Sequence, residues 1–306
     1  MKITDKIDAH THVASERLVP MPSFPDTIKI EVTSRCNFRC SYCAAGNRLR
    51  PVGDMDRDFL FRILREAKGI GVREIGMFLL GESFLLKELP EYIRYAKKEV
   101  GIEYIYLTTN GSLCTPQRLE AVIDAGLDSL KFSINAATPK KYAKMHGVDC
   151  FERVMEHLRW LGERRGQPGF RMKTSVSSIY VEEDREELDL LREEVLRHVD
   201  EFYYLPYYNQ AGHVRSVSGV VGNPGRLENP VASIPCWGLF NSAKISWDGW
   251  LTACYFDHDN RFEIADLHET SLAEAWHHPK FVELRRQHLE GTVENSLCAE
   301  CLGCQR

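Results

Sequence analysis

The chain has 306 residues, of which 43% are hydrophobic and 27% are charged, and its formal net charge is −5. These values are ordinary for a soluble globular protein, and the length suits a barrel with an appended unit better than one small domain. No basic face dominates, which argues against a nucleic-acid-binding protein. The first residues lack the apolar segment of a signal peptide, and no run approaches the roughly 18 apolar residues of a membrane span, so we expect a cytoplasmic protein.

The ten cysteines are the most informative part of the composition. In a short secreted chain they would predict disulfides, but here they cluster at spacings typical of thiolate ligands, and no signal peptide accompanies them. We therefore expect metal clusters in a reducing compartment. Such clusters are sensitive to oxygen, so the protein should require anaerobic handling.

Residues 1–25 are expected to form a polar lead-in that ends in a proline-rich segment. Within it, His10-Thr11-His12 resembles the metal-binding HxH motif of amidohydrolases. That motif belongs on the first strand of a barrel, with a lysine or further histidines and an aspartate on later strands. The prolines that follow, and the lack of such residues at later strand ends, favour a surface turn instead.

A β-branched strand is predicted over 27–34, and a loop carrying Cys36, Cys40 and Cys43 follows it directly. The three thiols can converge on one side of a tight loop, where they supply three corners of a metal or cluster site and leave the fourth open. Catalysis needs an open corner, because a fully ligated site can only hold structure or pass electrons. Zinc usually has a fourth protein ligand nearby, and none of the polar residues between these cysteines is one.

The CxxxCxxC spacing, with Tyr42 before the third cysteine, resembles the radical S-adenosylmethionine (SAM) superfamily. The resemblance implies that Cys36, Cys40 and Cys43 hold three irons of a [4Fe–4S] cluster, and that the fourth iron chelates the amino and carboxylate groups of SAM. It also implies an external electron donor, such as a flavodoxin or a ferredoxin. A zinc loop and unrelated core cysteines are the competing interpretations.

From residue 27 onward, predicted strands and amphipathic helices alternate. Strands are expected at 27–34, 74–80, 104–109, 129–135, 171–179 and 201–207, and helices at 56–69, 87–99, 116–125, 139–164 and 182–198. This alternation predicts βαβ units and a parallel sheet. Five or six such units match the partial (β/α)6 barrel of the radical SAM family, so the resemblance implies an α/β fold of this kind over 26–220. In such barrels the active site lies at the C-terminal ends of the strands.

Gly81 and Glu82 follow the second predicted strand and resemble the family's Gly-Gly-Glu motif. The first glycine of that motif is missing, and Ser83 stands where proline is commoner. The resemblance implies that Glu82 meets the ammonium group of SAM. A bare Gly-Glu pair would otherwise be only a turn.

Further SAM-binding candidates come from the next three strands. Asn110, at the end of the third strand, and Ser133 with Asn135, at the end of the fourth, resemble family motifs that reach the ribose and carboxylate of SAM. On the fifth strand, Lys173 and Ser175 are additional candidates. These residues indicate a binding site because they occur at the ends of successive strands. Asn-Gly alone is a common turn dipeptide.

After the sixth strand, residues 206–235 are rich in glycine, proline and asparagine, and we interpret them as a linker or substrate-facing loop with a domain boundary near 220. Beyond it, Asp248-Gly249 between alternating strands predicts a β-hairpin. This hairpin would bring Cys236 and Cys254 to one end of a small sheet.

A helical stretch over 271–289 leads to Cys298, Cys301 and Cys304. On spacing alone, a zinc ribbon and an iron–sulfur site are equally compatible. The order of the five late cysteines resembles the SPASM/twitch extension of radical SAM enzymes, in its shorter form with one auxiliary [4Fe–4S] cluster over 221–306. The resemblance implies four ligands, with Cys304 as a substitute for one of the last two: Cys236, Cys254, Cys298 and Cys301.

In this family, cleavage of SAM gives a 5′-deoxyadenosyl radical that removes hydrogen from an unactivated C–H bond of the substrate. A fully ligated auxiliary cluster would accept the electron left on a carbinol radical, and loss of a proton would give a ketone. This resembles the cyclitol and aminoglycoside alcohol dehydrogenases that carry a twitch domain. The hydroxyl proton requires a base, for which His213 or Glu228 are candidates, with Arg153 as a charge partner.

The runner-up is an epimerase, in which a thiol returns hydrogen to the opposite face of the substrate. Cys114, Cys150 and Cys304 are the cysteines left over for that role, and Cys114 lies nearest the predicted site, three residues past Gly111. A free cysteine is more often a buried small hydrophobic residue.

A third interpretation is modification of a ribosomal peptide, although the segment before the barrel is short for a leader-binding domain. A non-catalytic zinc-binding interaction module would explain the C-terminal cysteines. It would not explain the first cysteine triad together with Glu82, Asn110 and Ser133. We therefore expect an enzyme that acts on a small molecule, whose identity the sequence does not give.

Overall fold

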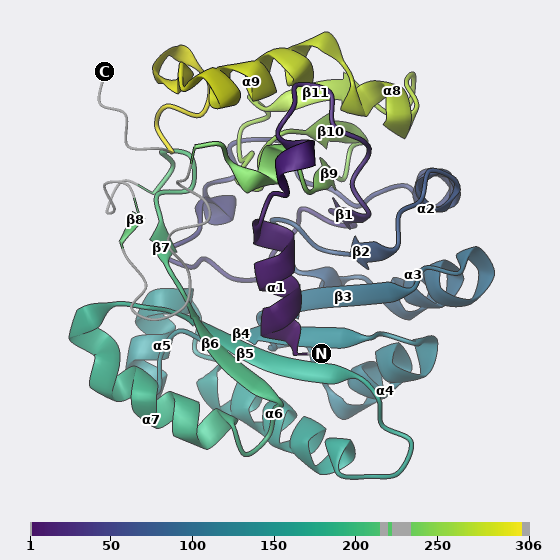
Figure 1. Ribbon diagram of the computed structural model, residues 1–306. Coiled ribbons are helices and arrows are strands. Elements are labelled where there is room, and N and C mark those ends of the chain that lie inside the picture. Colours follow the sequence, from purple (N-terminus) through teal and green to yellow (C-terminus); the bar gives the residue numbers. More distant parts are fainter. Residues whose placement is uncertain (1, 215–219, 222–233, 302–306) are drawn as a thin grey trace.

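The computed structural model describes residues 2–214, 220–221 and 234–301. Figure 1 shows one curved sheet with helices packed along it and a smaller group of strands and helices at one end. Six parallel strands in the order β1 to β6 form the larger part of the sheet. Their bounds are β1 Thr27–Ile30, β2 Glu74–Gly76, β3 Tyr104–Thr109, β4 Ser129–Ser133, β5 Lys173–Ile179 and β6 Glu201–Leu205. The predicted partial (β/α)6 barrel is confirmed.

Helices connect each strand to the next, as parallel pairing requires. They are α2 Arg57–Gly69, α3 Leu89–Arg94 with a π-helical continuation Tyr95–Val100, α4 Pro116–Ala125, α5 Pro139–His146, α6 Phe151–Arg165 and α7 Arg185–Val195. Several boundaries differ from the sequence-based prediction, and the second strand, for example, ends at Gly76 instead of residue 80. The helix expected over 139–164 is two helices separated at Gly147, and the first strand ends at Ile30 instead of residue 34, because Val32 and Ser34 bond to the segment at Gly53–Met55.

Side chains alternate between the two faces of this sheet. Ile28, Ile105 and Leu130 lie on the face that packs against the helices and are fully buried in the core. Lys29 and Tyr106, one residue along their strands, line a cavity on the opposite face. All six strands run parallel, so the polar residues that begin them, such as Glu74 and Glu201, lie at the same end of the barrel.

The C-terminal strands extend the barrel sheet. The hairpin strands are β9 Ala243–Ile245 and β10 Trp250–Thr252, followed by β11 Glu263–Asp266. The hairpin predicted at Asp248-Gly249 is present, and Gly249 has a φ of +92° that suits glycine. The expectation of a separate small sheet was wrong, because β9 pairs in parallel with β1 and makes a single nine-stranded sheet. Helices α8 Leu272–Trp276 and α9 Pro279–Glu290 complete this part, and a short pair consists of β7 Tyr207–Tyr208 and β8 Val220–Val221.

The N-terminal segment contains a helix, α1 Ile3–Thr11, that crosses the barrel. Its first turn bonds to the carboxylate of Glu201 at the start of β6, and its Lys6 forms an ion pair with Glu74 at the start of β2. Its C-terminal end is held by Asn241, whose side-chain amide donates to the carbonyls of residues 10 and 12. The helix therefore closes the end of the barrel at which the strands begin.

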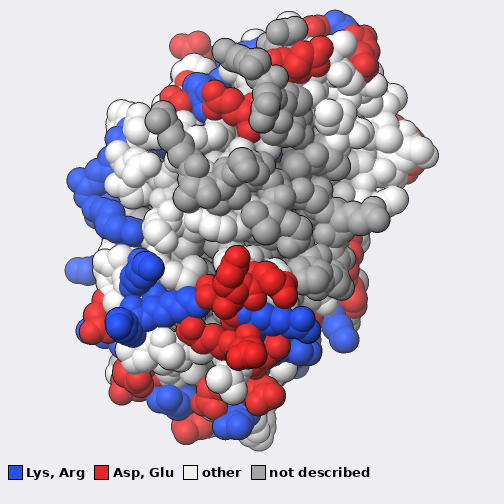
Figure 2. All heavy atoms as spheres, turned by 90° about the vertical axis from the view of Figure 1, so that its left-hand side faces the viewer, with Lys and Arg blue, Asp and Glu red and all other residues white. Residues whose placement is uncertain are grey.

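The exposed surface carries mixed charge. Figure 2 shows acidic and basic side chains interleaved on the lower part of the face at the left of Figure 1. Ion pairs between neighbouring helices are part of the structure, and Lys141, for example, pairs with both Asp184 and Glu187. None of the helices in the described part of the chain combines the length and apolar composition that a bilayer crossing requires.

Candidate cluster and cofactor site

The loop that carries Cys36, Cys40 and Cys43 follows β1 and is held by the end of α5. The backbone N–H of Arg39 donates to the carbonyl of His146 at 3.2 Å, and that of Ser41 donates to the carbonyl of Met145 at 2.8 Å. Gly147 permits this approach, since a Cβ at that position would lie 2.5 Å from the carbonyl oxygen of Arg39. The break between α5 and α6 thus places a helix end against the cysteine loop.

The three thiols of this loop are half-buried and influence one another. Burial is the main cause that raises the pKa of Cys36 to about 11 and that of Cys40 to about 12, and neighbouring thiols add to both shifts. Thiolates at this site therefore need nearby positive charge, which cluster iron would provide. The three donors fit a cluster that keeps one iron open.

His146 connects this loop to the end of β4. It is fully buried, and its Nε2 accepts a hydrogen bond from the backbone N–H of Asn135 at 3.2 Å. Burial lowers its pKa to about 3, so the ring is neutral and its proton resides on Nδ1. Nδ1 lies 3.0 Å from the hydroxyl of Tyr42 and 3.7 Å from the sulfur of Cys40. A fixed donor thus faces the first cysteine site.

The Gly81-Glu82 turn lies directly against the cysteine loop. The N–H of Glu82 donates to the carbonyl of Arg35 at 2.8 Å, and a Cβ on Gly81 would lie 2.1 Å from the carbonyl oxygen of Thr33. Only glycine fits there, which explains this half of the motif. The buried carboxylate of Glu82 accepts from the hydroxyl of Thr109 at 2.8 Å and from the N–H of Asn110 at 2.7 Å. These bonds join the ends of β2 and β3.

Asn110 contacts the cysteine loop through its side chain. Its amide donates to the side-chain oxygen of Asn37 at 2.9 Å, and Asn37 donates in turn to the hydroxyl of Ser112 at 2.9 Å. The structure therefore brings Gly81, Glu82 and Asn110 together around the cysteines, as the sequence-based interpretation requires. Asn37 is a participant that sequence reasoning did not assign.

Of the SAM-binding candidates predicted on the fourth and fifth strands, those on β4 lie toward the cysteine loop and those on β5 do not. Ser133 ends β4 on the face that lines the barrel, and Asn135 is buried and accepts the N–H of Ile179 at 2.7 Å. The expectation for Lys173 does not fit, because this exposed residue begins β5 and lies at the opposite end of the strand from the cysteine loop. Ser175 also lies farther from the cysteine loop than the end of β5 does, and it lines the cavity on the inner face of the sheet. Ser177 pairs with Ser133, so it is the β5 residue that lies beside the C-terminal end of β4.

The second cysteine group closes around one small cavity. Cys236, Cys254, Cys298 and Cys301 all line a space of about 40 Å³, together with apolar side chains such as Phe256. Zn–S distances of about 2.3 Å would require four thiols in near contact. No three His, Cys, Asp or Glu side chains in the described residues converge closely enough to hold a single metal ion. A space enclosed by four thiols suits a larger group, so the predicted four ligands fit an iron–sulfur cluster.

Two polar side chains support this second site. His288 accepts the backbone N–H of Cys236 on Nδ1 at 3.2 Å, and burial lowers its pKa to about 4, which leaves the proton on Nε2. That nitrogen is buried without a partner among the described residues, and the ring lines the four-cysteine cavity. Lys244 is fully buried in β9 and donates to the carbonyl of Ala253 at 3.0 Å. Neither residue was predicted, because no local motif marks either one.

The candidates for hydrogen transfer are less well supported. Cys114 is fully buried in the hydrophobic core, 3.6 Å from the hydroxyl of Thr109, and does not line the central cavity. This burial disfavours its predicted role as a hydrogen donor, which stays a prediction. Arg153 is exposed on α6 in the outer helix layer, which removes it as a charge partner at the site. Cys304 and Glu228 lie outside the described residues.

His213 belongs to a segment that contacts the cysteine loop through Gln210. Gln210, three residues earlier, accepts the N–H of Ala44 at 3.0 Å and donates to the carbonyl of Tyr42 at 2.9 Å. The Nε2 of His213 is 3.5 Å from a carboxylate oxygen of Asp259. The same Nε2 accepts a hydrogen bond from the guanidinium of Arg261 at 3.2 Å, and Arg261 in turn pairs with Asp259 at 2.7 Å.

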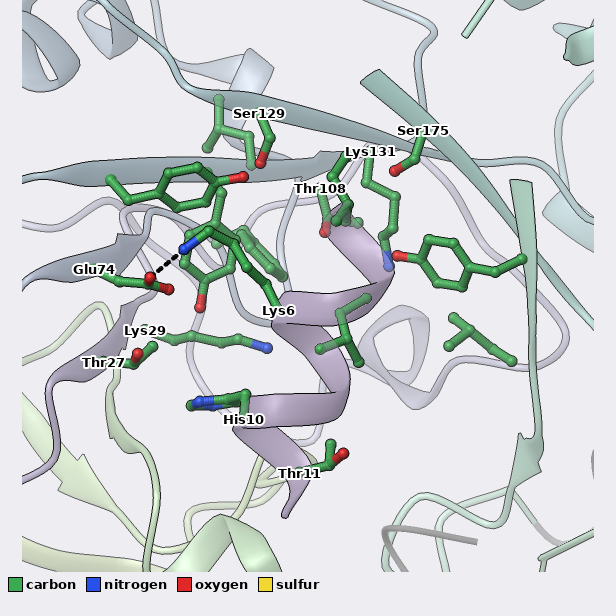
Figure 3. Close-up of a pocket in the computed structure, with 18 of the residues that line it drawn as sticks. Lys6, His10, Thr11, Thr27, Lys29, Glu74, Thr108, Ser129, Lys131 and Ser175 are labelled. Carbon is green, nitrogen blue, oxygen red and sulfur yellow. Dashed lines mark hydrogen bonds and ion pairs between the residues drawn. The ribbon is translucent and has the colours of Figure 1, made fainter. Parts of the chain in front are cut away.

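A cavity of about 220 Å³, the barrel cavity, lies between α1 and the strands of the barrel (Figure 3). Strand residues Lys29, Thr108 and Lys131 line one side, and helix residues Lys6 and His10 line the other. The surface turn expected at His10-Thr11-His12 was therefore wrong, because His10 is the penultimate residue of α1 and faces this cavity. His12 is exposed, so the two histidines do not form a metal pair.

Two family models match the chain. One, described as the radical SAM superfamily, covers residues 30–195, and the other, described as a SPASM iron–sulfur cluster-binding domain, covers residues 236–305. The chain belongs to the radical SAM superfamily. Its cofactors are therefore SAM and [4Fe–4S] clusters, for which the two cysteine groups described above are the available ligands.

Curated relatives share only part of the chain. A GTP 3′,8-cyclase from Chlorobaculum tepidum is 35% identical over 133 residues, which is 44% of this chain and 40% of that protein. An AdoMet-dependent heme synthase from Methanosarcina barkeri is 29% identical over 178 residues, 58% of this chain and 50% of that protein. The matches thus span half or less of these relatives.

Solved structures resemble the whole chain in fold. BtrN in complex with AdoMet and 2-DOIA has a TM-score of 0.62 at 18% identity, covering 92% of this chain and 94% of that one. SuiB of Streptococcus suis bound to precursor peptide SuiA has a TM-score of 0.70 at 17% identity, covering 98% and 72%. Likeness at this level of identity shows the shared fold.

Proposed function

We propose that the enzyme oxidises an alcohol of a small cyclic molecule of the sugar, cyclitol or aminoglycoside type to a ketone. The observation that carries this proposal is the closed set of four thiols around the C-terminal cavity. A cluster with four protein ligands has no open iron for a substrate, so accepting an electron is its natural role. An enzyme that needs an electron acceptor beside a radical-generating site fits an oxidation.

The reaction removes two hydrogens from the carbinol. When bound, SAM and the clusters take the carbon-bound hydrogen atom and the remaining electron, with the first electron supplied by a flavodoxin or ferredoxin in a reducing cytoplasm. The hydroxyl proton must go to a group of the chain. We assign this role to His213, since it follows Gln210 in the segment that contacts the cysteine loop.

The size of the barrel cavity supports a small substrate. A cavity of about 150 Å³ in another protein accommodates benzene, so the space of about 220 Å³ found here can hold one substituted six-membered ring. Walls formed by Tyr104, Tyr106 and Trp237 offer flat apolar surfaces to such a ring. This favours a small molecule over a peptide, although the fold is also that of the peptide-bound SuiB.

The epimerase alternative needs a thiol beside the substrate. Cys114 was the nearest candidate in sequence, and its place in the hydrophobic core disfavours that role. Cys150 precedes α6, where it is half-buried and packs against the same core, and Cys304 lies outside the described residues. Oxidation is therefore the better-supported outcome of the two.

A single incubation separates these reactions. The reconstituted enzyme, SAM, a reductant and a panel of cyclitols and aminosugars are combined in D₂O under anaerobic conditions, and products are measured by mass spectrometry. We expect 5′-deoxyadenosine and a product two mass units lighter than its substrate. An unoxidised product one unit heavier would instead establish epimerisation, and the Cys36→Ala variant should give neither product.

A further inference from the structure

The barrel cavity carries an excess of positive charge. Among its described lining residues there are three lysines and one carboxylate, that of Glu74. Lys6 on α1 pairs with that carboxylate, as the dashed line in Figure 3 shows. This leaves Lys29 of β1 and Lys131 of β4 for whatever occupies the space.

Lys29 and Lys131 have no anionic partner within the part of the chain that the structure describes. The ammonium of Lys29 lies over the rings of Phe78 and Tyr255, at 4.9 and 4.3 Å from their centroids, but forms no ion pair. In Figure 3 both side chains extend from their strands toward α1. Burial lowers the pKa of Lys29 to about 7 and that of Lys131 to about 8, and the charge of Lys131 further disfavours that of Lys29.

Unpartnered polar atoms surround the same space. The hydroxyl of Ser175 is fully buried and has no hydrogen-bond partner in the described residues, and Ser175 pairs directly with Lys131 across the sheet. The Nε2 of His10 and the indole N–H of Trp237 are likewise buried and unsatisfied, and both residues line the cavity. Buried polar groups normally have partners, so several unmet ones around one cavity indicate a polar ligand.

We propose that the substrate carries an anionic group, a phosphate or a carboxylate, which Lys29 and Lys131 bind inside the barrel with a hydrogen bond from Ser175. This inference rests on the proposed function, because it places the substrate in the barrel cavity. It narrows the substrate class to sugar phosphates or sugar acids and disfavours cationic aminoglycosides, which two unpaired ammonium groups would repel.

The same geometry orients the substrate. Lys29 and Lys131 project from the middle of β1 and β4, whereas Ser133 lies farther toward the cysteine loop on β4. An anion held by the lysines leaves the rest of the ring directed toward the strand ends where SAM binds. The carbon that is oxidised should therefore lie on the side of the ring away from the anionic group.

Isothermal titration calorimetry on the anaerobically reconstituted enzyme tests this site with two probes, inorganic phosphate and acetate. The variants are Lys29→Met, Lys131→Met and Ser175→Ala, and the control is Lys140→Met, which removes an exposed lysine from α5. We expect each lysine variant to lose about tenfold or more in affinity, since hydrogen bonds to charged groups are among the stronger ones. Lys29→Arg should retain binding within a few-fold, and Lys140→Met should match the wild type.

The two probes distinguish the ligand source: tighter phosphate binding indicates a phosphorylated substrate, and tighter acetate binding a carboxylic acid. A wild-type enzyme that binds neither anion would overturn the inference, as would lysine variants that bind like the wild type. If a methionine variant unfolds, the melting temperatures of the wild type and of Lys29→Arg are measured with and without phosphate. A rise in both proteins supports the site, and no rise in either overturns the inference. Failure of the wild-type enzyme to cleave SAM reductively would instead count against the proposed function alone.

Discussion

His146 and His288 form the same type of arrangement at the two cysteine sites. Each ring accepts a backbone N–H on one nitrogen, from Asn135 in one case and from Cys236 in the other, and each is kept neutral by burial. The remaining nitrogen then carries a proton that can be donated toward sulfur. Such donors stabilise the more negative, reduced state of an iron–sulfur cluster.

Replacing His288 with phenylalanine should therefore lower the reduction potential of the auxiliary cluster. We expect a shift of roughly 20 to 60 mV, because a net hydrogen bond contributes about 0.5–1.5 kcal/mol and 59 mV corresponds to tenfold for one electron. Redox titration followed by electron paramagnetic resonance measures this quantity. His146→Phe is the matched control, since it should shift only the SAM-binding cluster. Equal shifts in both clusters from either variant would contradict the assignment.

The two cavity lysines should leave a signature in the pH dependence of stability. Lys29 and Lys131 have pKa values lowered to about 7 and about 8, below the ordinary 10.5 that applies to the unfolded chain. Above pH 7 the unfolded chain therefore binds more protons than the folded one, and the free energy of unfolding rises with pH. The Lys29→Met/Lys131→Met variant lacks this contribution. At low pH this variant should have the higher free energy of unfolding, because it does not bury two ammonium groups. In urea titrations without phosphate, we expect the difference in free energy of unfolding between variant and wild type to shrink between about pH 6.5 and about pH 8.5. A difference that stays constant with pH would contradict the lowered pKa values.

At the scale of elements, β1 is the strand that joins the two halves of the protein. It pairs with β2 on one side and with β9 on the other. Just past its end, the buried carboxylate of Glu31 binds Arg50 at 2.6 Å and accepts the N–H groups of Leu80 and Trp247, each at 3.2 Å. One side chain thus fixes the segment after the cysteine loop, the turn before Gly81 and the C-terminal hairpin.

Removing Glu31 should be strongly destabilising. Loss of one partner leaves the buried charge of Arg50 and two backbone donors unpaired, for which we expect a cost of about 3–5 kcal/mol in the free energy of unfolding. Chemical denaturation under anaerobic conditions measures the change for Glu31→Ala. Glu152→Ala, at an exposed position on α6, should be nearly neutral. A loss as small as that of the control would show that the network does not hold the halves together.

The sequence predicted elements well where the signal was local. Alternating patterns located the six parallel strands and the hairpin at Asp248-Gly249, because these depend on side-chain period and turn residues. Pairing between distant segments was not accessible in the same way. The parallel contact of β9 with β1 has no local signature, and the end of β1 at Ile30 depends on bonds to Gly53 and Met55. The helix α1 was missed because Ile3 and Ile7 are its only large apolar residues.

The site was predictable to the extent that a motif marks it. Glu82 and Asn110 were located by strand-end motifs, and the structure places both at the cysteine loop. Lys173 was assigned by strand membership alone, and the register then put it at the wrong end of β5. Lys131 lies two residues before Ser133 on the same face of β4, so alternation along the strand was the signal that could have identified it.

At the scale of the whole molecule, one continuous sheet carries both cysteine groups. We nevertheless expect each group to bind its iron–sulfur cluster independently of the other. In Cys254→Ser/Cys298→Ser we expect iron to fall from about eight to about four per chain, as for loss of one of two [4Fe–4S] clusters. Reductive cleavage of SAM should persist while ketone formation is lost. Iron quantitation and product analysis measure both effects.

Cys114→Ala is the matched control for that experiment. Because this thiol packs in the core and does not line the barrel cavity, its loss should leave the iron content and the ratio of products unchanged. A selective loss of product without loss of iron would revive the epimerase interpretation. Retention of about eight irons in the double serine variant would contradict the four-thiol assignment.

The helix that closes the barrel lies outside both segments matched by the family models, which cover residues 30–195 and 236–305. The cysteine motif of the barrel and the helical wall of the barrel cavity are therefore encoded in separate stretches of the chain. A short N-terminal replacement could change the shape of the accepted molecule while leaving every cysteine in place. Changes of specificity that arise in these first dozen or so residues would not be detected by comparison of the catalytic motifs alone.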